Sequence, residues 1–219
     1  MKTCVIMQPT YLPWLGYFDL MKSSDVFVFL DHVQFSKQSW QQRNKIRDKN
    51  GEQMLTVSVK KPSEKDAQIN EIVIDHNRKS LIKHLKSIKS NYGKSKNFKE
   101  IYPKLEEIYS KEYKLLVDLN VELINLGCKE MEFHPEIVFS STLNIETKKV
   151  EGIIEICSKV EADHYLSPVG AQGYIEENNI FSENNISLSF QEYSHPLYEQ
   201  INYKDFISHL SFIDYLLNK

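Results

Sequence analysis

Two unbroken apolar runs near the N-terminus constrain the fold of this chain more than any other feature. The first is Thr3–Met7 (TCVIM) and the second is Val26–Leu30 (VFVFL). Unbroken runs suit strands that are covered on both faces, as the strands of parallel sheets are. Between them, residues 14–22 carry apolar side chains at intervals of about one helical turn. The order strand, helix, strand predicts a βαβ unit with a crevice at the carboxyl end of the first strand.

The middle of the chain combines irregular and helical segments. Residues 31–49 are polar and aromatic without periodicity, which predicts a long loop, while residues 53–60 alternate like a half-buried strand and residues 69–74 are a further strand candidate. From residue 78 the pattern is helical and ends at Gly127, with Pro103 as a start or a kink. This block, rich in lysine and glutamate, predicts a helical insert at about residues 78–127.

The C-terminal third continues the alternation of helices and strands. The patterns predict a helix over Glu146–Ser158 capped by Asn144, strands over His164–Ser167 and Ser187–Phe190, and a last helix over about Lys204–Leu217. We find no internal repeat and no evident linker. The sequence therefore predicts a single α/β domain over residues 1–219, with a parallel, Rossmann-like sheet, flanking helices and the helical insert.

Composition and charge narrow the class of protein. With 41% hydrophobic and 11% aromatic residues the chain can build a sizeable core, so a mainly disordered protein is excluded. No apolar stretch approaches the roughly 20 residues that cross a bilayer. The apolar run after Lys2 is too short for a secretory signal, and we expect a cytoplasmic protein. A formal net charge of -3 disfavours a dedicated binder of duplex nucleic acid.

The cysteines do not indicate a metal site. Cys4, Cys128 and Cys157 are far apart and form no CxxC or Cys/His cluster. We expect them to be buried thiols of a protein in a reducing compartment.

The first strand leads into the turn QPTYLPWLGYF. Gly16 at the start of the helix could let a phosphate approach backbone amides at the positive end of the helix dipole. The turn resembles that of the HxGH nucleotidylyltransferases, in which two histidines flank a helix-start glycine, and this extends the fold expectation to a nucleotidylyltransferase-like sheet. Trp14 and Tyr17 occupy the histidine positions here, so adenylyl transfer by the histidine mechanism is disfavoured. The alternative is a core-packing aromatic turn.

The loop after the second strand collects basic, aromatic and polar side chains. Arg43 and Lys45 are two residues apart, so on an extended segment they point the same way and could hold a diphosphate. Trp40 could stack on a base or a sugar. The further substrate-binding candidates of this loop are Gln34 and Asn44. Such a loop beside a sheet crevice indicates a site for an anionic ligand, and a solvated surface loop is the alternative.

Two histidines are candidates for acid/base catalysis. His32 directly follows Asp31, and a carboxylate can orient a histidine that removes a proton from an amine or a hydroxyl. Neighbouring residues of a strand face opposite ways, so Asp31 need not be its partner. His195 precedes a proline and should be extended. For both histidines a purely structural role is the alternative.

The segment HYLSPVGAQGYI predicts a strand, a turn of small residues and a helix. Ser167, Gly170 and Gln172 could present hydroxyl, amide and carboxamide groups to a ligand, and Tyr198 in the following polar segment is a further candidate. No GxSxG elbow is present, so Ser167 is not assigned as a nucleophile.

Several segments in the same order resemble the WbqC-like proteins. They are QPTYLPWLGYFDLMKSSDVFVFLDHVQFSKQSWQQRNKI, NGEQMLTVSV, YLSPVGAQGYI and YEQINYKDFISHLSFIDYLLN. The residues that match the family motifs are Gln8, Pro9, Tyr11, Pro13, Trp14, Gly16, Tyr17, Asp31, Gln34, Trp40, Arg43, Asn44, Ser211 and Asp214. The Ser-Gly-Pro that usually precedes the second motif is only Leu166-Ser167-Pro168 here, so this turn departs from the family pattern.

The resemblance implies a function in surface polysaccharide synthesis. The family is associated with gene clusters for O-antigen-type polysaccharides of lipopolysaccharide, beside enzymes that make nucleotide-linked deoxyamino sugars. The implied reaction is the transfer of an aminoacyl or acyl group to the amine of such a sugar. In this hypothesis Arg43 and Lys45 bind the diphosphate, Tyr11 and Trp40 position the sugar or base, and His32 deprotonates the ammonium.

An oxyanion formed in this reaction needs hydrogen-bond donors. Gln8, Asn44 or the backbone amides at Gly16 could supply them.

Two other hypotheses remain from the sequence. One is an ATP-dependent ligase or nucleotidylyltransferase-like enzyme whose first turn binds ATP, and the other is a non-catalytic module that binds sugar nucleotides or organises a pathway. The expected partners are a nucleotide-linked amino sugar and an activated acyl or aminoacyl donor, whose carrier is ATP-derived, CoA or tRNA. A net charge of -3 gives tRNA little support. No membrane span is expected, a homodimer is left open, and the cofactor is not identified.

Overall fold

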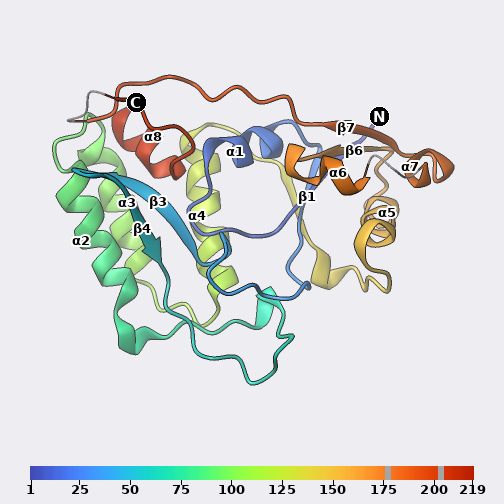
Figure 1. The fold of residues 1–219 in the computed structure, drawn as a ribbon, viewed down its shortest axis with the longest axis horizontal. Coiled ribbons are helices and arrows are strands. Elements are labelled where there is room, and N and C mark those ends of the chain that lie inside the picture. The colour runs from blue at the N-terminus through green and yellow to red at the C-terminus, as the bar shows by residue number, and fades with distance from the viewer. Residues whose placement is uncertain (176–178, 202–204) are drawn as a thin grey trace. The chain divides into compact units, whose positions relative to one another are not determined.

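The chain folds into two units. The computed structural model describes residues 1–175, 179–201 and 205–219 (Figure 1). Unit 1 consists of residues 1–8, 17–32 and 133–194, and unit 2 of residues 9–16, 33–132 and 195–219. The single domain over residues 1–219 stays a prediction.

Unit 1 is built on a parallel sheet. Its strands are β1 (Thr3–Met7), β2 (Val26–Phe29), β5 (Glu136–Phe139), β6 (His164–Ser167) and β7 (Ser187–Phe190). Among the described residues these five strands lie in the order β5-β2-β1-β6-β7, and all neighbours pair in parallel. The chain extends the sheet from β1 first to one side and later to the other, so β1 and β6 flank its topological switch point. The predicted α/β class with a parallel, Rossmann-like sheet is confirmed.

Helices connect the strands of unit 1. They are α1 (Leu15–Lys22), α5 (Lys149–Lys159), α6 (Gln172–Ile175) and α7 (Ile180–Glu183). The predicted βαβ unit is confirmed as β1, α1 and β2. The predicted cap of α5 is wrong, because the helix begins at Lys149 and Asn144 instead takes a left-handed backbone conformation, φ 51°, several residues earlier.

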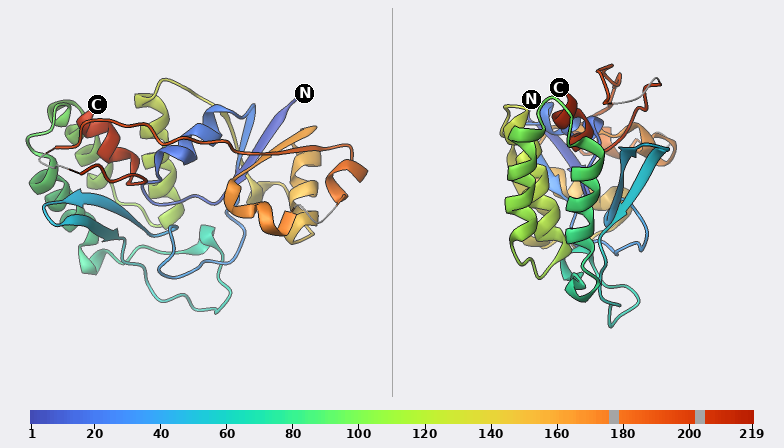
Figure 2. Two further views of the ribbon diagram at one scale, coloured as in Figure 1. Left: turned by 45° about the horizontal axis from the view of Figure 1, so that its top comes forward. Right: turned by 90° about the vertical axis from the view of Figure 1, so that its left-hand side faces the viewer.

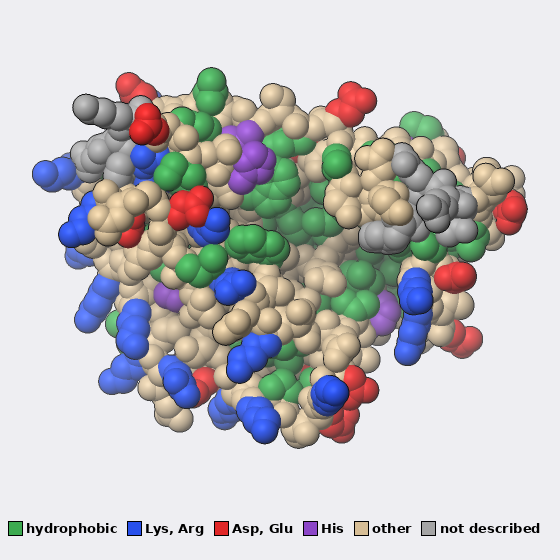
Figure 3. Space-filling model, in the orientation of Figure 1, with side chains coloured by type: hydrophobic (Ala, Val, Ile, Leu, Met, Phe, Trp, Pro, Cys, Tyr) green, Lys and Arg blue, Asp and Glu red, His purple; other side chains and the backbone are tan. Residues whose placement is uncertain are grey.

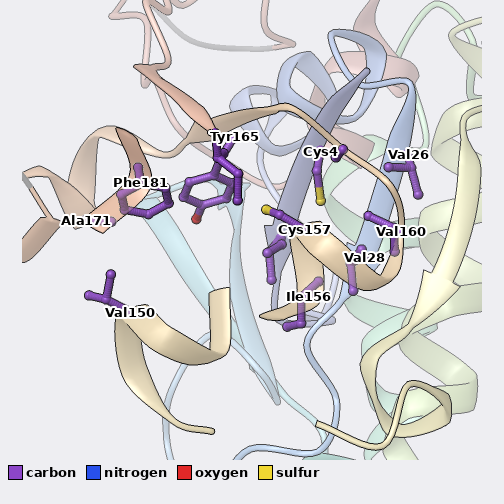
Figure 4. Packing of buried hydrophobic residues seen from close by; sticks show 13 residues of the cluster. Cys4, Val26, Val28, Val150, Ile156, Cys157, Val160, Tyr165, Ala171 and Phe181 are labelled. Atoms are coloured by element: carbon purple, nitrogen blue, oxygen red, sulfur yellow. The ribbon is translucent and has the colours of Figure 1, made fainter. Parts of the chain in front are cut away.

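Both faces of the central strands are covered, as their unbroken apolar sequences predicted. On one face, a buried cluster joins Cys4 of β1, Val26 of β2 and Cys157 of α5 (Figure 4). On the other face, the ring of Phe27 lies 5.5 Å from that of Tyr17 in α1, centroid to centroid. Because each fully buried large apolar side chain contributes roughly 1.5–3 kcal/mol, this two-sided burial stabilises the sheet.

The cysteines are buried thiols, as predicted. Cys4, Cys128 and Cys157 are all reduced and buried. The thiols of Cys4 and Cys157 contact one another, and this contact together with burial raises the pKa of Cys4 well above its ordinary value. Both thiols therefore act as small core residues.

Unit 2 contains an antiparallel hairpin and helices. The hairpin is β3 (Arg43–Asp48) with β4 (Gly51–Thr56), and the helices are α2 (Ser80–Tyr92), α3 (Phe98–Ser110), α4 (Leu116–Glu130) and α8 (Phe212–Asn218). Helix α3 packs against α2 on one side and α4 on the other (Figure 2). The predicted helical block is confirmed as three separate helices.

Several predicted boundaries in unit 2 are wrong. Residues 43–48 form a strand and not part of a loop. The segment pairs with β4 along its whole length, and its alternate residues Asn44 and Ile46 are buried although the segment is mostly polar. Residues 69–71 form a 3₁₀ turn instead of a strand. Helix α4 continues through Gly127, which is buried, and Pro103 lies inside α3 without beginning it.

The last helix is shorter than predicted. Ser211 accepts a hydrogen bond from the backbone of Ile213 and so caps α8 at Phe212. The predicted start at Lys204 lies outside the described residues. None of the helices that the structure describes is long and apolar enough to cross a membrane.

Candidate functional site

Polar residues stand at or just beyond the carboxyl end of every strand in the sheet of unit 1. They are Gln8 after β1, Asp31 after β2, Ser140 after β5, Ser167 at the end of β6 and Gln191 after β7. In open parallel sheets ligands bind at this edge, near the switch point. The carboxyl edge is therefore the candidate functional site of unit 1, where the sequence predicted a crevice.

Asp31 and His32 meet two serines at this edge. The carboxylate of Asp31 is buried and accepts hydrogen bonds from the Ser140 hydroxyl (3.0 Å), the Ser141 hydroxyl (2.7 Å) and the Ser141 backbone (2.9 Å). The Nδ1 atom of His32 lies 2.6 Å from Oγ of Ser140. Because β2 and β5 are parallel neighbours, both pairs of residues follow strands that end at the same edge.

A hydrogen bond donated by Ser140 to Asp31 is compatible with one neutral tautomer of His32. The Ser140 hydroxyl has one proton and donates it to the Asp31 carboxylate, which can only accept. Toward His32 the same oxygen must then accept, so Nδ1 is protonated. In the neutral imidazole the other nitrogen, Nε2, carries a lone pair. Ser140 thus links Asp31 to His32 even though the two residues are chain neighbours and do not pair directly.

The other predicted residues of unit 1 have different surroundings. Tyr17 is buried and donates a hydrogen bond to the backbone oxygen of Gln8 (3.0 Å), which braces the end of β1. Ser167 is fully buried and its hydroxyl lies 3.3 Å from the Pro168 oxygen. Gly170 and Gln172 are exposed. Roles for these residues in ligand binding stay predictions.

In unit 2 the turn before α1 is filled by an aromatic ring. The indole of Trp14 lies directly over Gly16, and a Cβ atom built on Gly16 would come within 2.1 Å of it. The ring also lies 5.0 Å from that of His209, centroid to centroid. Gly16 therefore leaves room for a side chain, and this packing supports the aromatic-turn interpretation over a phosphate at Gly16.

Tyr11 is part of a buried chain of hydrogen bonds. Its hydroxyl lies 2.7 Å from Nδ1 of His84 and also bonds to the hydroxyl of Tyr109. All three residues are buried, and burial lowers the pKa of His84 to about 4, although a hydrogen bond with the Thr56 backbone acts in the opposite direction. His84 is therefore neutral, and the predicted contact of Tyr11 with a sugar or base stays a prediction.

Strand β3 brings the predicted cations to one side of the hairpin. Arg43 and Lys45 alternate with the buried Asn44, so they share a face, as predicted. The ammonium of Lys45 forms an ion pair of 2.6 Å with Glu52, whereas Nε of Arg43 is buried without a hydrogen-bond partner among the described residues. Arg43 is consequently the better candidate for binding an anion.

The hairpin also borders a cavity in unit 2. This cavity measures about 790 Å³, and Met54 and Thr56 of β4 are among its lining residues. In the hairpin, Thr56 pairs with Arg43 and Met54 with Lys45, but neither of these cations is among the residues that line the cavity. The volume is in the range of small-molecule sites.

The remaining predicted residues of this loop separate into exposed and buried ones. Trp40 is 52% exposed and Gln34 is exposed, with its amide donating to the Lys65 oxygen. Asn44 is buried and donates to the backbone oxygen of Leu12 (2.8 Å), which holds a residue of positive φ in the first turn. An exposed tryptophan suits the predicted stacking role, while the oxyanion role of Asn44 stays a prediction.

A buried carboxylate joins three segments of unit 2. Asp214 of α8 accepts hydrogen bonds from Tyr92 (2.6 Å), Tyr198 (2.7 Å) and Gln200 (2.8 Å). Burial raises its pKa, while these donors and the charge of Arg47 act in the opposite direction. Tyr198 therefore has a structural partner, and its predicted contact with a substrate stays a prediction.

His195 is surrounded by rings. Its imidazole lies 4.9 Å from that of His209 and 5.9 Å from the ring of Phe206, centroid to centroid. Burial, and then the charge of His209, lower the pKa of His195. An acid/base role for His195 stays a prediction.

Sequence reasoning missed the two serines that contact Asp31. Strand β5 was not predicted because Pro135 and Glu136 interrupt its apolar run, so Ser140 and Ser141 were not placed at a strand end. The short apolar run of residues 137–139, followed directly by two serines, could have indicated a strand with polar residues at its carboxyl end. Among the residues that the structure describes, no group of three or more His, Cys, Asp or Glu side chains could hold a metal ion.

Comparison with known proteins gives two matches. The model of the WbqC-like protein family matches residues 8–219. An uncharacterized protein of Mycobacterium tuberculosis (strain ATCC 25618 / H37Rv), Rv1507c, is 30% identical over 220 residues, which cover 100% of this chain and 94% of the relative. No solved structure matches the chain.

We predict that Gly16→Ala displaces the indole of Trp14, because the new methyl group would overlap the ring. Overpacking of this kind typically costs about 1–3 kcal/mol. The measurement is urea unfolding, followed by fluorescence in a Trp40→Phe background in which Trp14 is the remaining tryptophan. The control is Gly173→Ala, where nothing lies within 4 Å of the added atom. Equal stability and emission for both variants would contradict the packing role.

We also predict a loss of stability on acidification that depends on His84. Its pKa is about 4 in the folded chain against 6.5 when exposed, so unfolding binds a proton as the pH falls below 6.5. The contribution of neutral His84 to the free energy of unfolding is complete above pH 6.5. It is lost as the pH falls toward 4, which lowers the free energy of unfolding by up to about 3 kcal/mol. The measurement compares free energies of unfolding at pH 7 and pH 4.5. His84→Gln should flatten this difference, and the exposed His76→Gln should not.

Proposed function

The chain belongs to the WbqC-like protein family, and from this premise we propose that it is an enzyme that transfers an acyl or aminoacyl group to the amine of a nucleotide-linked deoxyamino sugar. The family's association with surface polysaccharide synthesis supports this substrate class. The observation that carries the proposal is the arrangement of Asp31, Ser140 and His32 at the carboxyl edge of the sheet in unit 1.

His32 is the general base of the proposed reaction. The Ser140 hydroxyl donates a hydrogen bond to Asp31 and accepts one from Nδ1–H of His32. Nε2 of His32 can then accept a proton. The sugar ammonium first loses one proton to solvent, because an amine attacks a carbonyl only as the free base. After the C–N bond begins to form the nitrogen still carries a surplus proton, and His32 is the group that accepts it. A positioned base of this kind contributes about 10²–10⁴-fold.

The sugar nitrogen attacks the carbonyl carbon of the activated donor, a C–N bond forms, and the carbonyl electrons move to oxygen. His32 takes one proton from the nitrogen. When the carbonyl reforms, the bond to the carrier breaks, and the imidazolium returns the proton to the departing group.

Phosphate binding is a separate requirement of the proposal. Arg43 is its first candidate, because Nε is buried without a partner among the described residues and a guanidinium binds phosphate oxygens in pairs. The exposed ring of Trp40 offers a stacking surface for a base.

The experiment is a transfer assay read by mass spectrometry. Nucleotide-linked amino sugars are the acceptors, and acyl-CoA, acyl-adenylate and aminoacyl-tRNA are the donors. We expect His32→Gln to lower kcat by about 100-fold or more while binding of the acceptor is kept. His134→Gln, an exposed histidine of the same unit, is the matched control and should leave kcat unchanged.

Ser140→Ala tests the link between Asp31 and His32. Removing this buried hydroxyl leaves Nδ1 of His32 without its acceptor, so we expect a smaller loss of kcat and a shift of the acidic limb of the pH profile of kcat/KM. A purely structural serine would lower stability without moving that limb.

Each of three results would contradict the proposed reaction. Full turnover by His32→Gln would remove its base. Release of pyrophosphate from ATP with an acid substrate would indicate a ligase. Tight binding of sugar nucleotides without product from any donor would indicate a binding module.

A further inference from the structure

The charge of the chain is strongly segregated. Between residues 76 and 99 there are eight Lys or Arg residues and no Asp or Glu, although the chain contains 30 acidic residues in 219. At that average about three acidic residues would be expected in a stretch of this length. With 27 basic residues in total, the rest of the chain carries 19 basic and 30 acidic residues, a net charge of -11. The net charge of -3 is thus the sum of two opposite regions.

Helix α2 carries three of these eight basic residues, and the other five lie in the segments just before and after it. Its apolar side is buried in unit 2 through Leu81, Ile88 and Tyr92. Lys83, Lys86 and Lys89 are exposed, and Lys94, Lys96 and Lys99 continue the series into the first turn of α3. The side chains of α2 recur at about one per turn, which rises by 5.4 Å. We call this surface, with Arg78 and Lys79, the basic face.

The lysines of the basic face lack acidic partners. Among the described residues, none of these seven lysines forms an ion pair, and only Arg78 pairs with a carboxylate, that of Asp75. The neighbouring helices behave differently, since Lys104 pairs with Glu100 and Glu130. Lys and Arg side chains gather over the region of α2 in Figure 3. Electrostatic repulsion within such a row of like charges is relieved when the row binds an anion.

The dimensions of the basic face indicate an extended anion. Lys79 and Lys89 are ten residues apart, or about 15 Å along a helix, which exceeds the reach of one diphosphate. A membrane surface fits less well, because interfacial helices insert an apolar side. The apolar side of α2 is already buried, and Ile82 is its exposed large apolar residue. A polyanion with regularly spaced phosphates fits the row best.

We propose that the basic face binds the phosphate backbone of a folded RNA. The cavity lined by Arg78, Lys83 and the hydroxyls of Thr56, Ser80 and Ser87 opens beside this face. Serine and threonine hydroxyls are common partners of phosphate and sugar oxygens. This assignment rests on the proposed function, which requires an activated donor. The RNA is then an aminoacyl-tRNA, and the basic face binds the tRNA that carries the transferred aminoacyl group.

The first experiment measures binding of uncharged bulk tRNA to the full chain by fluorescence anisotropy at 50–200 mM salt. We expect log K to fall linearly with log salt, because each neutralised phosphate releases counterions. The variant Lys83→Glu/Lys86→Glu/Lys89→Glu should weaken binding at least about tenfold at 50 mM salt. It should lower the salt slope by about one for each lysine removed.

A matched variant controls for net charge. Lys22→Glu/Lys129→Glu/Lys148→Glu changes three exposed lysines outside the basic face and alters the total charge equally. It should bind tRNA like the wild type. Circular dichroism and thermal melting check that both variants are folded. An equal loss in both variants would overturn the proposal, because binding would then depend on total charge and not on the basic face.

Competing anions complete the test. Equal affinity for a DNA duplex of the same charge, or binding to phosphatidylglycerol vesicles without binding to tRNA, would overturn the RNA assignment. Transfer from acyl-CoA that tRNA does not affect would overturn the donor role. Binding of tRNA without transfer from any donor would overturn the proposed function and leave the basic face assigned, so the two failures are distinguishable.

Discussion

Parallel pairing of β1 with β2 and β6 is the constraint on which unit 1 depends. Strands that run in parallel end at one edge, so the residues that follow them in the sequence meet in space although up to 160 residues separate them. Two-sided burial of the strands makes this pairing stable, and it leaves their polar ends as the part of the sheet available for chemistry. The meeting of Asp31 with Ser140 is one direct consequence.

Two buried carboxylates, Asp31 and Asp214, accept similar sets of hydrogen bonds but have different roles. Asp31 accepts three hydrogen bonds from serines that follow β5, and through Ser140 it orients a half-exposed histidine. Asp214 accepts its bonds from Tyr92, Tyr198 and Gln200 and is fully enclosed. A buried carboxylate is tolerated only when donors surround it. The first network ends at a group that can exchange a proton, whereas the second ties together segments of unit 2.

Side-chain packing explains where the structure departs from the sequence patterns. In the first turn the indole of Trp14 lies over Gly16, which supports the alternative of an aromatic turn, and phosphate binding there stays a prediction. The sequence predicts a loop at residues 43–48 because the segment is mostly polar, whereas in the structure it pairs with β4 and buries alternate side chains. The helix expected to stop at Gly127 continues, since tertiary packing buries that glycine. In each case the packing of side chains differed from what the sequence pattern alone indicated.

The sequence by itself determined the parallel α/β class, the first βαβ unit, the helical block and the family. These follow from apolar periodicity and motif order, which are local properties of the chain. It also contained the run of unbalanced lysines. Only the tertiary structure decided that Ser140 joins Asp31 to His32, that Tyr11 and His84 are buried together, and that the lysines of α2 lie on one exposed face. The reason is physical: a hydrogen bond between distant residues depends on which strands become neighbours, and that is set by the burial of the whole unit.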